Sequence, residues 1–401
     1  MKNYILLFLF AGIVTAFNAF GQDEEKKPEE EGYVFTIEKE LDATPVKNQY
    51  RSGTCWSFSA ISFLESELLR MGKGEYNLSE MFVIRHAYGD KAKKYVRMHG
   101  NLNLAGGGAF HDVITVFKEY GMVPEEVYDG QVIGEENHIH GEMDNVVKAY
   151  VKAVVDNKNK KLTPVWYQGL VGILDAYLGE IPEEFEYNGE KQTPKSFAKS
   201  LGLNMDDYVE LSSFTHHSFY EEFVLEVPDN WEWGLVYNLP MKEFNEVLDY
   251  AIDNGYTIAW GADVSEKGFS WKNGVAIVPE VDMLDMTDTE KEKWEELTEK
   301  EKQAALYKFD KPGREKTITQ EMHQKAFDNY SMTDDHGMHI TGKAKDQNGN
   351  EYFIVKNSWG DGGKYDGYFY ASKSFVLMNT LDIMVHKDAI PKHIKKKLGF
   401  D

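Results

Sequence analysis

The chain has 401 residues, of which 42% are hydrophobic and 28% are charged. This composition is typical of a globular protein that buries a large core, in one domain with insertions or in two smaller domains. The formal net charge of −23 argues against nucleic acid as a partner, because phosphate binding needs clustered lysines and arginines. The single cysteine, Cys55, has no partner for an intrachain disulfide, so it is either a small core residue or a nucleophile.

The first 21 residues have the pattern of a secretory signal peptide. Lys2 precedes an apolar run over residues 4–20, and small residues come before an expected cut near Gln22. An uncleaved membrane anchor is the alternative, but the run is marginally short for a span, which needs about 20 residues. We therefore expect an exported protein, periplasmic or extracellular, without stable membrane insertion after cleavage. The acidic residues 22–32 are expected to be a linker.

Helical patterns dominate the first part of the mature chain. An extended segment is expected over residues 33–41, and a loop then leads to Cys55, where apolar residues begin to recur at helical spacing. A second helix is expected after Ser79, a residue type that caps helix N-termini. A third helix follows the glycine-rich sequence "AGGGA". The segment from about 125 to 325 is predicted to be a large, mainly helical insertion, which includes one exposed charged helix over 287–309.

Strand patterns dominate the end of the chain. Residues 336–360 alternate like two antiparallel strands, and Asn348-Gly349 is typical of the hairpin turn between them. A further strand is expected over 367–376. This order, helices first and strands last, predicts an α+β fold. We expect one domain over residues 33–401 that includes the helical insertion.

The surroundings of Cys55 match the needs of acyl transfer by a thiol. Its position at the start of a helix places the sulfur near unpaired backbone N–H groups, which favour a thiolate. The hairpin brings together His336, a candidate imidazole partner, and Asn357, a group that orients the ring. Gln49 offers a side-chain amide for the oxyanion, together with the N–H of Cys55. Trp359 is expected to shield the contact between the histidine and the asparagine from water.

These residues carry a resemblance to a known family. The sequences "PVKNQYRSGTCWSFSA", "HGMHITG" and "VKNSWGDGG" resemble, in the same order, the three signature blocks of the papain-like cysteine peptidases. The resemblance implies a papain-like fold with a helical left domain and an antiparallel-sheet right domain. It also implies that Cys55 is the nucleophile, with His336, Asn357 and Gln49 in the roles given above. Gly106, Gly107 and Gly108 resemble the stretch that binds the substrate backbone in that family.

Two departures from the papain pattern resemble the bleomycin hydrolase and aminopeptidase C branch. The chain has no second cysteine near Cys55, and a large segment precedes the histidine block. That branch implies a homo-oligomer, a hexamer with inward-facing sites, and a C-terminal tail in the cleft that restricts cleavage to the N-terminal end of peptides. The chain ends differently from the tail typical of that branch, and Asp401 is the candidate anchor for the substrate amine.

Other candidate residues have plainer interpretations. His339 is a rival to His336, but residues three apart on a strand point to opposite faces, and the spacing to Gly342 favours His336. The histidines at 138–140 and 216–217 lack a recognisable metal-ligand spacing, so a surface or polar-network role is expected. The sequence "AGGGA" lacks the Lys-Ser/Thr of a phosphate-binding loop. Asp334 and Asp335 either raise the pKa of His336 or form a solvated turn.

The sequence therefore predicts a cysteine aminopeptidase of the bleomycin hydrolase type, acting on peptide substrates without a metal or an organic cofactor. A papain-like endopeptidase is the nearest alternative, in which the C-terminal tail stays out of the cleft. A binding or scaffold protein with a retired active site is a weaker one, because all four expected site positions are filled. A transglutaminase-like acyl transferase is weaker still, since aspartate is expected there in place of Asn357.

Overall fold

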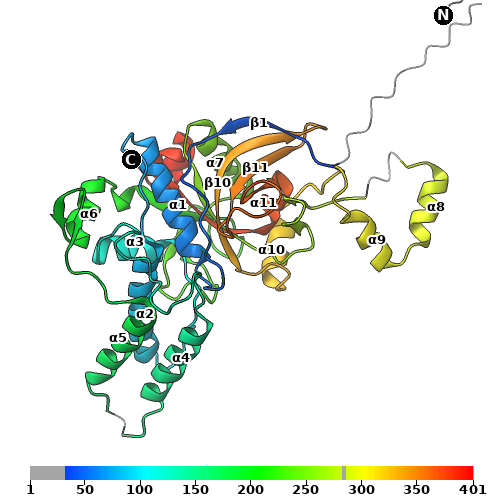
Figure 1. The fold of residues 1–401 in the computed structure, drawn as a ribbon. Helices are drawn as coiled ribbons and strands as arrows, with labels where there is room; N and C mark the ends of the chain where they lie inside the picture. Colours follow the sequence, from blue (N-terminus) through cyan, green and yellow to red (C-terminus); the bar gives the residue numbers. More distant parts are fainter. Residues whose placement is uncertain (1–31, 160, 282–285, 401) are drawn as a thin grey trace, which may run out of the picture. The chain divides into compact units, whose positions relative to one another are not determined.

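A sheet of eleven strands, with helices packed against it, forms most of the chain that this computed structural model describes, residues 32–159, 161–281 and 286–400 (Figure 1). The expected signal peptide and nearly all of the expected linker lie outside the described residues. No helix among the described residues is long and apolar enough to cross a membrane.

The large sheet is mostly antiparallel. Only the pairs β4–β6 and β12–β9 are parallel among the described strand pairs. Its order along the sheet is β5 (Glu222–Val224), β6 (Leu235–Asn238), β4 (Tyr208–Ser212), β13 (Thr380–His386), β7 (Ile258–Ala262), β10 (His336–Asp346), β11 (Glu351–Lys356), β12 (Tyr368–Ser372), β9 (Val275–Ala276) and β8 (Phe269–Ser270), with β1 (Phe35–Glu40) paired to β10. A separate hairpin consists of β2 (Phe185–Tyr187) and β3 (Glu190–Gln192).

Two groups of helices build the cores on either side of the active-site region. One core is formed mainly by the N-terminal helices α1 (Cys55–Arg70), α2 (Glu80–Arg97), α3 (Phe110–Glu119), α4 (Gly141–Val155), α5 (Val165–Leu178) and α6 (Pro194–Leu201). The second core lies between the sheet and α7 (Met241–Asp253), α11 (Lys373–Asn379) and α12 (Lys392–Leu398). The remaining helices are α8 (Asp288–Glu296), α9 (Glu299–Leu306), α10 (Gln320–Asp328) and the 3₁₀ turns η1 (Met205–Asp207) and η2 (Lys387–Ala389).

The contact between α1 and β10 positions the site. α1 is buried along almost its whole length, because the helical core covers one side and β10 lies against the other (Figure 1). Gly337 makes the close approach possible, since a Cβ built there would lie 3.2 Å from the Cα of Trp56 and 3.3 Å from the carbonyl carbon of Cys55. The absence of a side chain at this position therefore brings the start of β10 against the start of α1.

The structure confirms the predicted α+β fold class and several elements. The thiol-bearing helix begins at Cys55, Ser79 accepts a hydrogen bond from the N–H of Phe82 as the N-cap of α2, and β10 and β11 form the expected hairpin. The segment 125–325 contains α4 to α9 and most of α10, but it also supplies β4, β5, β6, β7, β8 and β9 to the large sheet. The segment is therefore an integral part of the sheet and not only a helical insertion.

Two predicted elements differ from the expectation. The strand predicted over 367–376 stops at Ser372, because the Ser372 hydroxyl accepts a hydrogen bond from the N–H of Phe375 and caps α11. The exposed helix predicted over 287–309 is two helices, α8 and α9. The break lies at Thr298, whose side chain caps α9 in a reciprocal arrangement with Glu301.

Candidate active site

Cys55 is the first residue of α1, and the N-terminus of this helix is left without a side-chain cap. Thr54 occupies the N-cap position, but its hydroxyl is hydrogen-bonded to the hydroxyl of Ser52 and accepts nothing from the helix. The first N–H groups of a helix have no partner within the helix. The N–H of Cys55 is therefore a hydrogen-bond donor that lies next to the thiol of the same residue. An oxyanion site needs a donor at such a position.

His336, the first residue of β10, is held by two residues that come shortly after the end of β11, Asn357 and Trp359. The Nε2 atom of His336 lies 2.7 Å from the Oδ1 atom of Asn357, and Oδ1 also accepts a hydrogen bond from the N–H of Ser358. The indole of Trp359 stacks on the imidazole, with ring centroids 4.8 Å apart. Because an amide oxygen can only accept, Nε2 carries the proton and Nδ1 is left as the basic atom.

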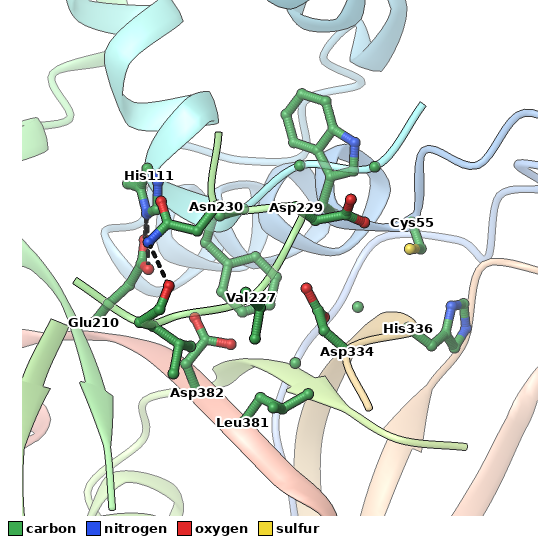
Figure 2. A pocket seen from close by; sticks show the side chains of 18 of the residues that line it. Cys55, His111, Glu210, Val227, Asp229, Asn230, Asp334, His336, Leu381 and Asp382 are labelled. Atoms are coloured by element: carbon green, nitrogen blue, oxygen red, sulfur yellow. Dashed lines mark hydrogen bonds and ion pairs between the residues drawn. The ribbon is translucent and has the colours of Figure 1, made fainter. Parts of the chain in front are cut away.

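The sulfur and the imidazole meet at one end of a single pocket. Cys55 and His336 both line this pocket, and Figure 2 shows them together at its right-hand side. The N–H groups of Gly337 and Trp56 donate hydrogen bonds to the sulfur. The structure thus brings together two residues that are 281 positions apart in the chain, which is the juxtaposition that the sequence motifs predicted.

Burial dominates the ionisation of both groups. It raises the pKa of the Cys55 thiol to about 12, and the hydrogen bond from Gly337 opposes this rise. It lowers the pKa of His336 to about 4, against the effect of Asn357. The neutral thiol and the neutral imidazole are therefore the favoured resting forms. The expectation that the helix N-terminus makes this thiol acidic was wrong, because burial outweighs the N–H groups. Asp334 and Asp335 also do not raise the pKa of His336 above its usual range.

Gln49 is fixed to Ser358, the residue after Asn357, through its side-chain carbonyl oxygen. Oε1 accepts a hydrogen bond of 2.7 Å from the hydroxyl of Ser358, and the backbone N–H of Gln49 donates to the carbonyl of the same serine. The side chain is buried, so its orientation is set by these contacts. The hydrogen bond to Ser358 uses the acceptor end of the amide and leaves the NH₂ end as the donor for a ligand.

The glycine-rich stretch forms one wall of the pocket. Gly107 and Gly108 line it, whereas Gly106 lies behind and accepts a hydrogen bond from the indole nitrogen of Trp56 at 3.0 Å. Glycine is needed because the stretch is tightly packed: a Cβ at 108 would lie 2.8 Å from the Trp56 ring. Lys91 holds the stretch from behind by donating to the carbonyls of Ala105 and Gly107.

The pocket lining is also rich in acidic side chains, of which the sequence motifs pointed only to Asp334 and Asp335. Five carboxylate side chains line the pocket, and no lysine or arginine is among its lining residues: Glu210, Asp229, Asp334, Asp335 and Asp382. His111 pairs with Glu210 at 3.0 Å, and although burial opposes it, the charge of Glu210 raises the pKa of His111 to about 10. The acids come from four separate segments, so no local motif could have revealed them.

The rival histidines lie elsewhere. The Nδ1 atom of His339 is 2.9 Å from the hydroxyl of Ser62, about two helical turns along α1 from Cys55. His138 and His140 are buried rather than exposed, and burial lowers the pKa of both. They line a separate pocket with other residues of 130–143, and their backbone exchanges hydrogen bonds with Arg51.

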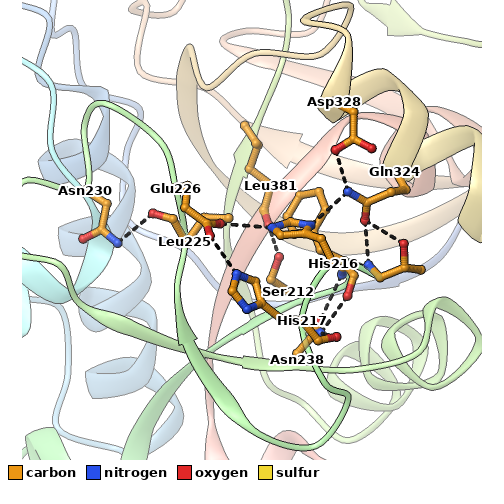
Figure 3. A network of polar contacts seen from close by, with 12 residues as sticks. Ser212, His216, His217, Leu225, Glu226, Asn230, Asn238, Gln324, Asp328 and Leu381 are labelled. Carbon is orange, nitrogen blue, oxygen red and sulfur yellow. Dashed lines mark hydrogen bonds and ion pairs between the residues drawn. The ribbon is translucent and has the colours of Figure 1, made fainter.

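His216 and His217 belong to a network of hydrogen bonds (Figure 3). Their Nε2 atoms lie 3.0 and 2.7 Å from the carboxylate of Glu226. Gln324 donates to Nδ1 of His216, since its oxygen already accepts from the N–H of Thr215. A ring that accepts at Nδ1 keeps its proton at Nε2, where a metal would bind. This geometry favours the polar network over a metal site.

The C-terminal tail follows a different course from the one that the family resemblance implied. α12 packs into the second core, Lys397 pairs with Glu243, and the ring of Phe400 lies against Tyr237 at a centroid distance of 4.9 Å. None of the described residues from 392 to 400 lines the active-site pocket. Asp401, the expected amine anchor, lies outside the described residues.

Comparisons with known proteins agree with this geometry. Residues 35–166 match the model of the papain family cysteine proteases, and residues 302–400 match that of the peptidase C1-like family. These two matches contain all of the expected catalytic and positioning residues. The chain belongs to the papain-like cysteine peptidases. More narrowly, this peptidase falls in the aminopeptidase C and bleomycin hydrolase branch.

Relatives match this peptidase over most of its length. It is 25% identical to aminopeptidase C of Streptococcus thermophilus, over 90% of this chain and 83% of the relative. It is 24% identical to aminopeptidase G of Lactobacillus delbrueckii subsp. lactis, over 90% of this chain and 85% of the relative. The crystal structure of PepW from Lactobacillus rhamnosis HN001 superposes with a TM-score of 0.69 at 18% identity, covering 91% of this peptidase and 84% of PepW, which shows the shared fold.

Proposed function

We propose that this peptidase is a cysteine aminopeptidase that removes N-terminal residues from peptides. The observation that carries the proposal is the orientation of His336, whose Nε2 is engaged by Asn357 while its ring lies in the same pocket as the sulfur of Cys55. Relatives that align over about nine-tenths of the chain are named aminopeptidases, which supports exopeptidase activity over endopeptidase activity on the same core.

The neutral resting pair defines the first chemical step. As the sulfur of Cys55 bonds to the scissile carbonyl carbon, its proton passes to Nδ1 of His336, so neither group has to hold an isolated buried charge beforehand. The oxygen that becomes negative accepts hydrogen bonds from the N–H of Cys55 and the amide of Gln49. Asn357 stabilises the imidazolium through its contact with Nε2.

The remaining steps return the enzyme to its starting state. The imidazolium gives its proton to the leaving nitrogen as the C–N bond breaks, which releases the shortened peptide and leaves an aminoacyl thioester on Cys55. Water then attacks the thioester while His336 takes a proton from it. The C–S bond breaks, the free amino acid leaves, and the proton returns to the sulfur. Trp359 limits access of bulk water to the imidazole, which keeps the contact with Asn357 strong.

Digestion of one peptide in two forms tests this function. A decapeptide with a free amine and the same peptide N-acetylated are incubated with the reduced enzyme, and the products are followed by mass spectrometry. We expect stepwise loss of N-terminal residues from the free form, no cleavage of the acetylated form, and no reaction with Cys55→Ala. Internal cleavage of both forms would favour an endopeptidase, and no cleavage of either would favour a retired site.

Export and assembly are further parts of the proposal. The N-terminal sequence pattern supports removal of residues 1–21 and a periplasmic or extracellular enzyme. The family resemblance supports a homo-oligomer of six subunits. Size-exclusion chromatography with light scattering measures the assembly, and a monomer under assay conditions would contradict it.

A further inference from the structure

A segment between β5 and β6 closes one end of the catalytic pocket. This closing segment, residues 225–234, supplies Leu225, Val227, Asp229 and Asn230 to the pocket lining. Its shape is fixed internally, since Asn230 donates to the carbonyls of Leu225 and Gly234 and accepts from the N–H of Gly234.

The closing segment is also fastened to the helical core. The indole nitrogen of Trp231 donates to the buried carboxylate of Asp112 at 2.6 Å, and Lys94 donates to the carbonyl of Glu232 at 2.6 Å. The ammonium group of Lys94 also lies 3.7 Å from the ring centroid of Trp233. These contacts come from α2 and α3, so the segment is a fixed part of the wall.

Asp229 meets the glycine-rich stretch at the point where an extended peptide would continue. Its carboxylate rests on Gly107 so closely that a Cβ built on that glycine would lie 1.7 Å from Oδ2. Asn103 donates to Oδ1 at 2.8 Å and holds the carboxylate there. The backbone of Gly107 is therefore covered by Asp229, and a peptide bound at Cys55 has little room beyond its first residue.

The pocket lining holds more acidic than basic side chains: five carboxyl groups face His111, which is paired with Glu210. Asp334 lies between Asp229 and Asp382 (Figure 2), and burial together with the charge of Asp229 raises the pKa of Asp334 to about 7. Asp382 is 9% exposed, points into the pocket and has another carboxyl, that of Glu210, as its side-chain hydrogen-bonding neighbour. Two facing carboxyls need either a shared proton or a cation.

We propose that Asp229 and Asp334 bind the α-ammonium group of the substrate's N-terminal residue, and that the closing segment ends the cleft just beyond that residue. The inference rests on the aminopeptidase function proposed above and names the groups that recognise the free amine. A primary ammonium group offers three donors and one positive charge. This suits two carboxylates in a pocket lining that holds no lysine or arginine and whose basic histidine, His111, is already paired with Glu210.

The same carboxylates influence the nucleophile. The charges of Asp334 and Asp229 add to burial in raising the pKa of Cys55. An ammonium group bound between them cancels that effect and makes the proton transfer to His336 easier. A substrate with a free amine thus gains in binding and in reactivity. A blocked substrate leaves the charges of Asp229 and Asp334 in place, and its binding also costs the desolvation of these two carboxylates.

The competing anchor is the C-terminus of the chain. The described tail runs along α7 and β6 up to Phe400 and contributes nothing to the pocket lining. Among the described residues, the pocket acids are therefore the groups placed to bind the amine.

Two substrates that differ only in the amine test the inference. Alanyl and propionyl 7-amido-4-methylcoumarin have the same scissile bond, but the propionyl compound lacks the amino group. In the wild-type enzyme, kcat/KM is expected to be at least about 100-fold higher for the alanyl substrate. Asp334→Asn is expected to raise KM for the alanyl substrate roughly 10- to 100-fold, while kcat/KM for the propionyl substrate does not fall.

Three further variants separate the explanations. Asp361→Asn removes the same charge from an exposed loop outside the pocket and should leave both substrates unaffected. Asp229→Asn should reproduce the effect of Asp334→Asn, and it provides the test if the Asp334 variant does not fold. Deletion of Phe400 and Asp401 should preserve the preference for the alanyl substrate.

The outcomes distinguish the two proposals. If Asp334→Asn and Asp229→Asn lower the activity on both substrates equally, or if only the tail deletion removes the preference, the amine-binding role is overturned while the aminopeptidase function stands. If the wild-type enzyme hydrolyses the alanyl and propionyl compounds equally well, the aminopeptidase function itself fails.

Discussion

Replacing Gly337 by alanine tests whether the contact between α1 and β10 aligns the catalytic pair. The added Cβ would lie 2.7 Å from the hydroxyl of Ser59, 3.2 Å from the Cα of Trp56 and 3.3 Å from the carbonyl carbon of Cys55. Ordinary contact begins at 3.4 Å, so the shortfalls are 0.7 Å (3.4 − 2.7), 0.2 Å (3.4 − 3.2) and 0.1 Å (3.4 − 3.3). The serine hydroxyl is able to rotate, but the two backbone atoms are fixed in the helix.

The variant should therefore move the start of β10 by a few tenths of an ångström. Overpacking of this kind costs about 1–3 kcal/mol of folding free energy. The shift also displaces His336 and the N–H of Gly337 that donates to the Cys55 sulfur. Because small misplacements of reacting groups are costly, kcat/KM for alanyl 7-amido-4-methylcoumarin should fall roughly 10- to 100-fold.

The assay compares this variant with two others. Gly362→Ala adds the same methyl group at an exposed glycine with nothing within 4 Å, and should leave the activity and the thermal midpoint unchanged. Ser59→Ala combined with Gly337→Ala removes the largest overlap and should recover part of the lost activity. Wild-type kcat/KM and an unchanged thermal midpoint in Gly337→Ala would refute the idea that this packing sets the catalytic geometry.

Three other predictions address separate features. Asn357→Ala should lower kcat roughly 10- to 100-fold with little change in KM, because the imidazole loses the acceptor that orients it; steady-state kinetics measures this. Lys47→Met should destabilise the fold by about 2–4 kcal/mol in urea unfolding, since it leaves two buried glutamates, Glu65 and Glu80, without their shared cation. The intact mass of the protein recovered from its native host should correspond to a chain that begins near Gln22; retention of Lys2 would contradict cleavage.

The sequence was most informative where chemistry and local structure coincide in short stretches. Cys55 could be placed at the start of an apolar-striped helix. His336 could be placed on one strand of a hairpin with an Asn-Gly turn, and Asn357 directly after the other strand, because each motif also fixes its own backbone geometry. The hairpin then determines which histidine meets Asn357. These elements gave the fold class and the candidate catalytic residues.

The rest of the site depends on contacts between distant segments. Asp229 lies in a loop, Glu210 on β4 and Asp382 on β13, and these strands could not be recognised because they are short and buried within a mixed sheet. The acids converge only when β13 inserts between β4 and β7. Single-sequence patterns contain no information on that pairing.

The ionisation of Cys55 was mispredicted for a related reason. The sequence locates the N–H groups at the start of α1, but burial of the sulfur depends on His336, Gly337 and the closing segment, which pack around it only in the folded chain. The pKa of Cys55 depends on the balance between these N–H donors and burial, which is a property of that packing. Burial has the larger effect, which favours a thiol that loses its proton during attack.

The most direct test of the account is covalent labelling of Cys55 by an alanine-derived vinyl sulfone that carries a free amine. Mass spectrometry of the digested protein locates the adduct and measures its rate of formation. We predict stoichiometric modification at Cys55, slowed at least about 100-fold in His336→Ala. Labelling at an equal rate in wild type and His336→Ala, or no labelling of Cys55 in the folded enzyme, would contradict the claim that this thiol and this imidazole act as one catalytic pair.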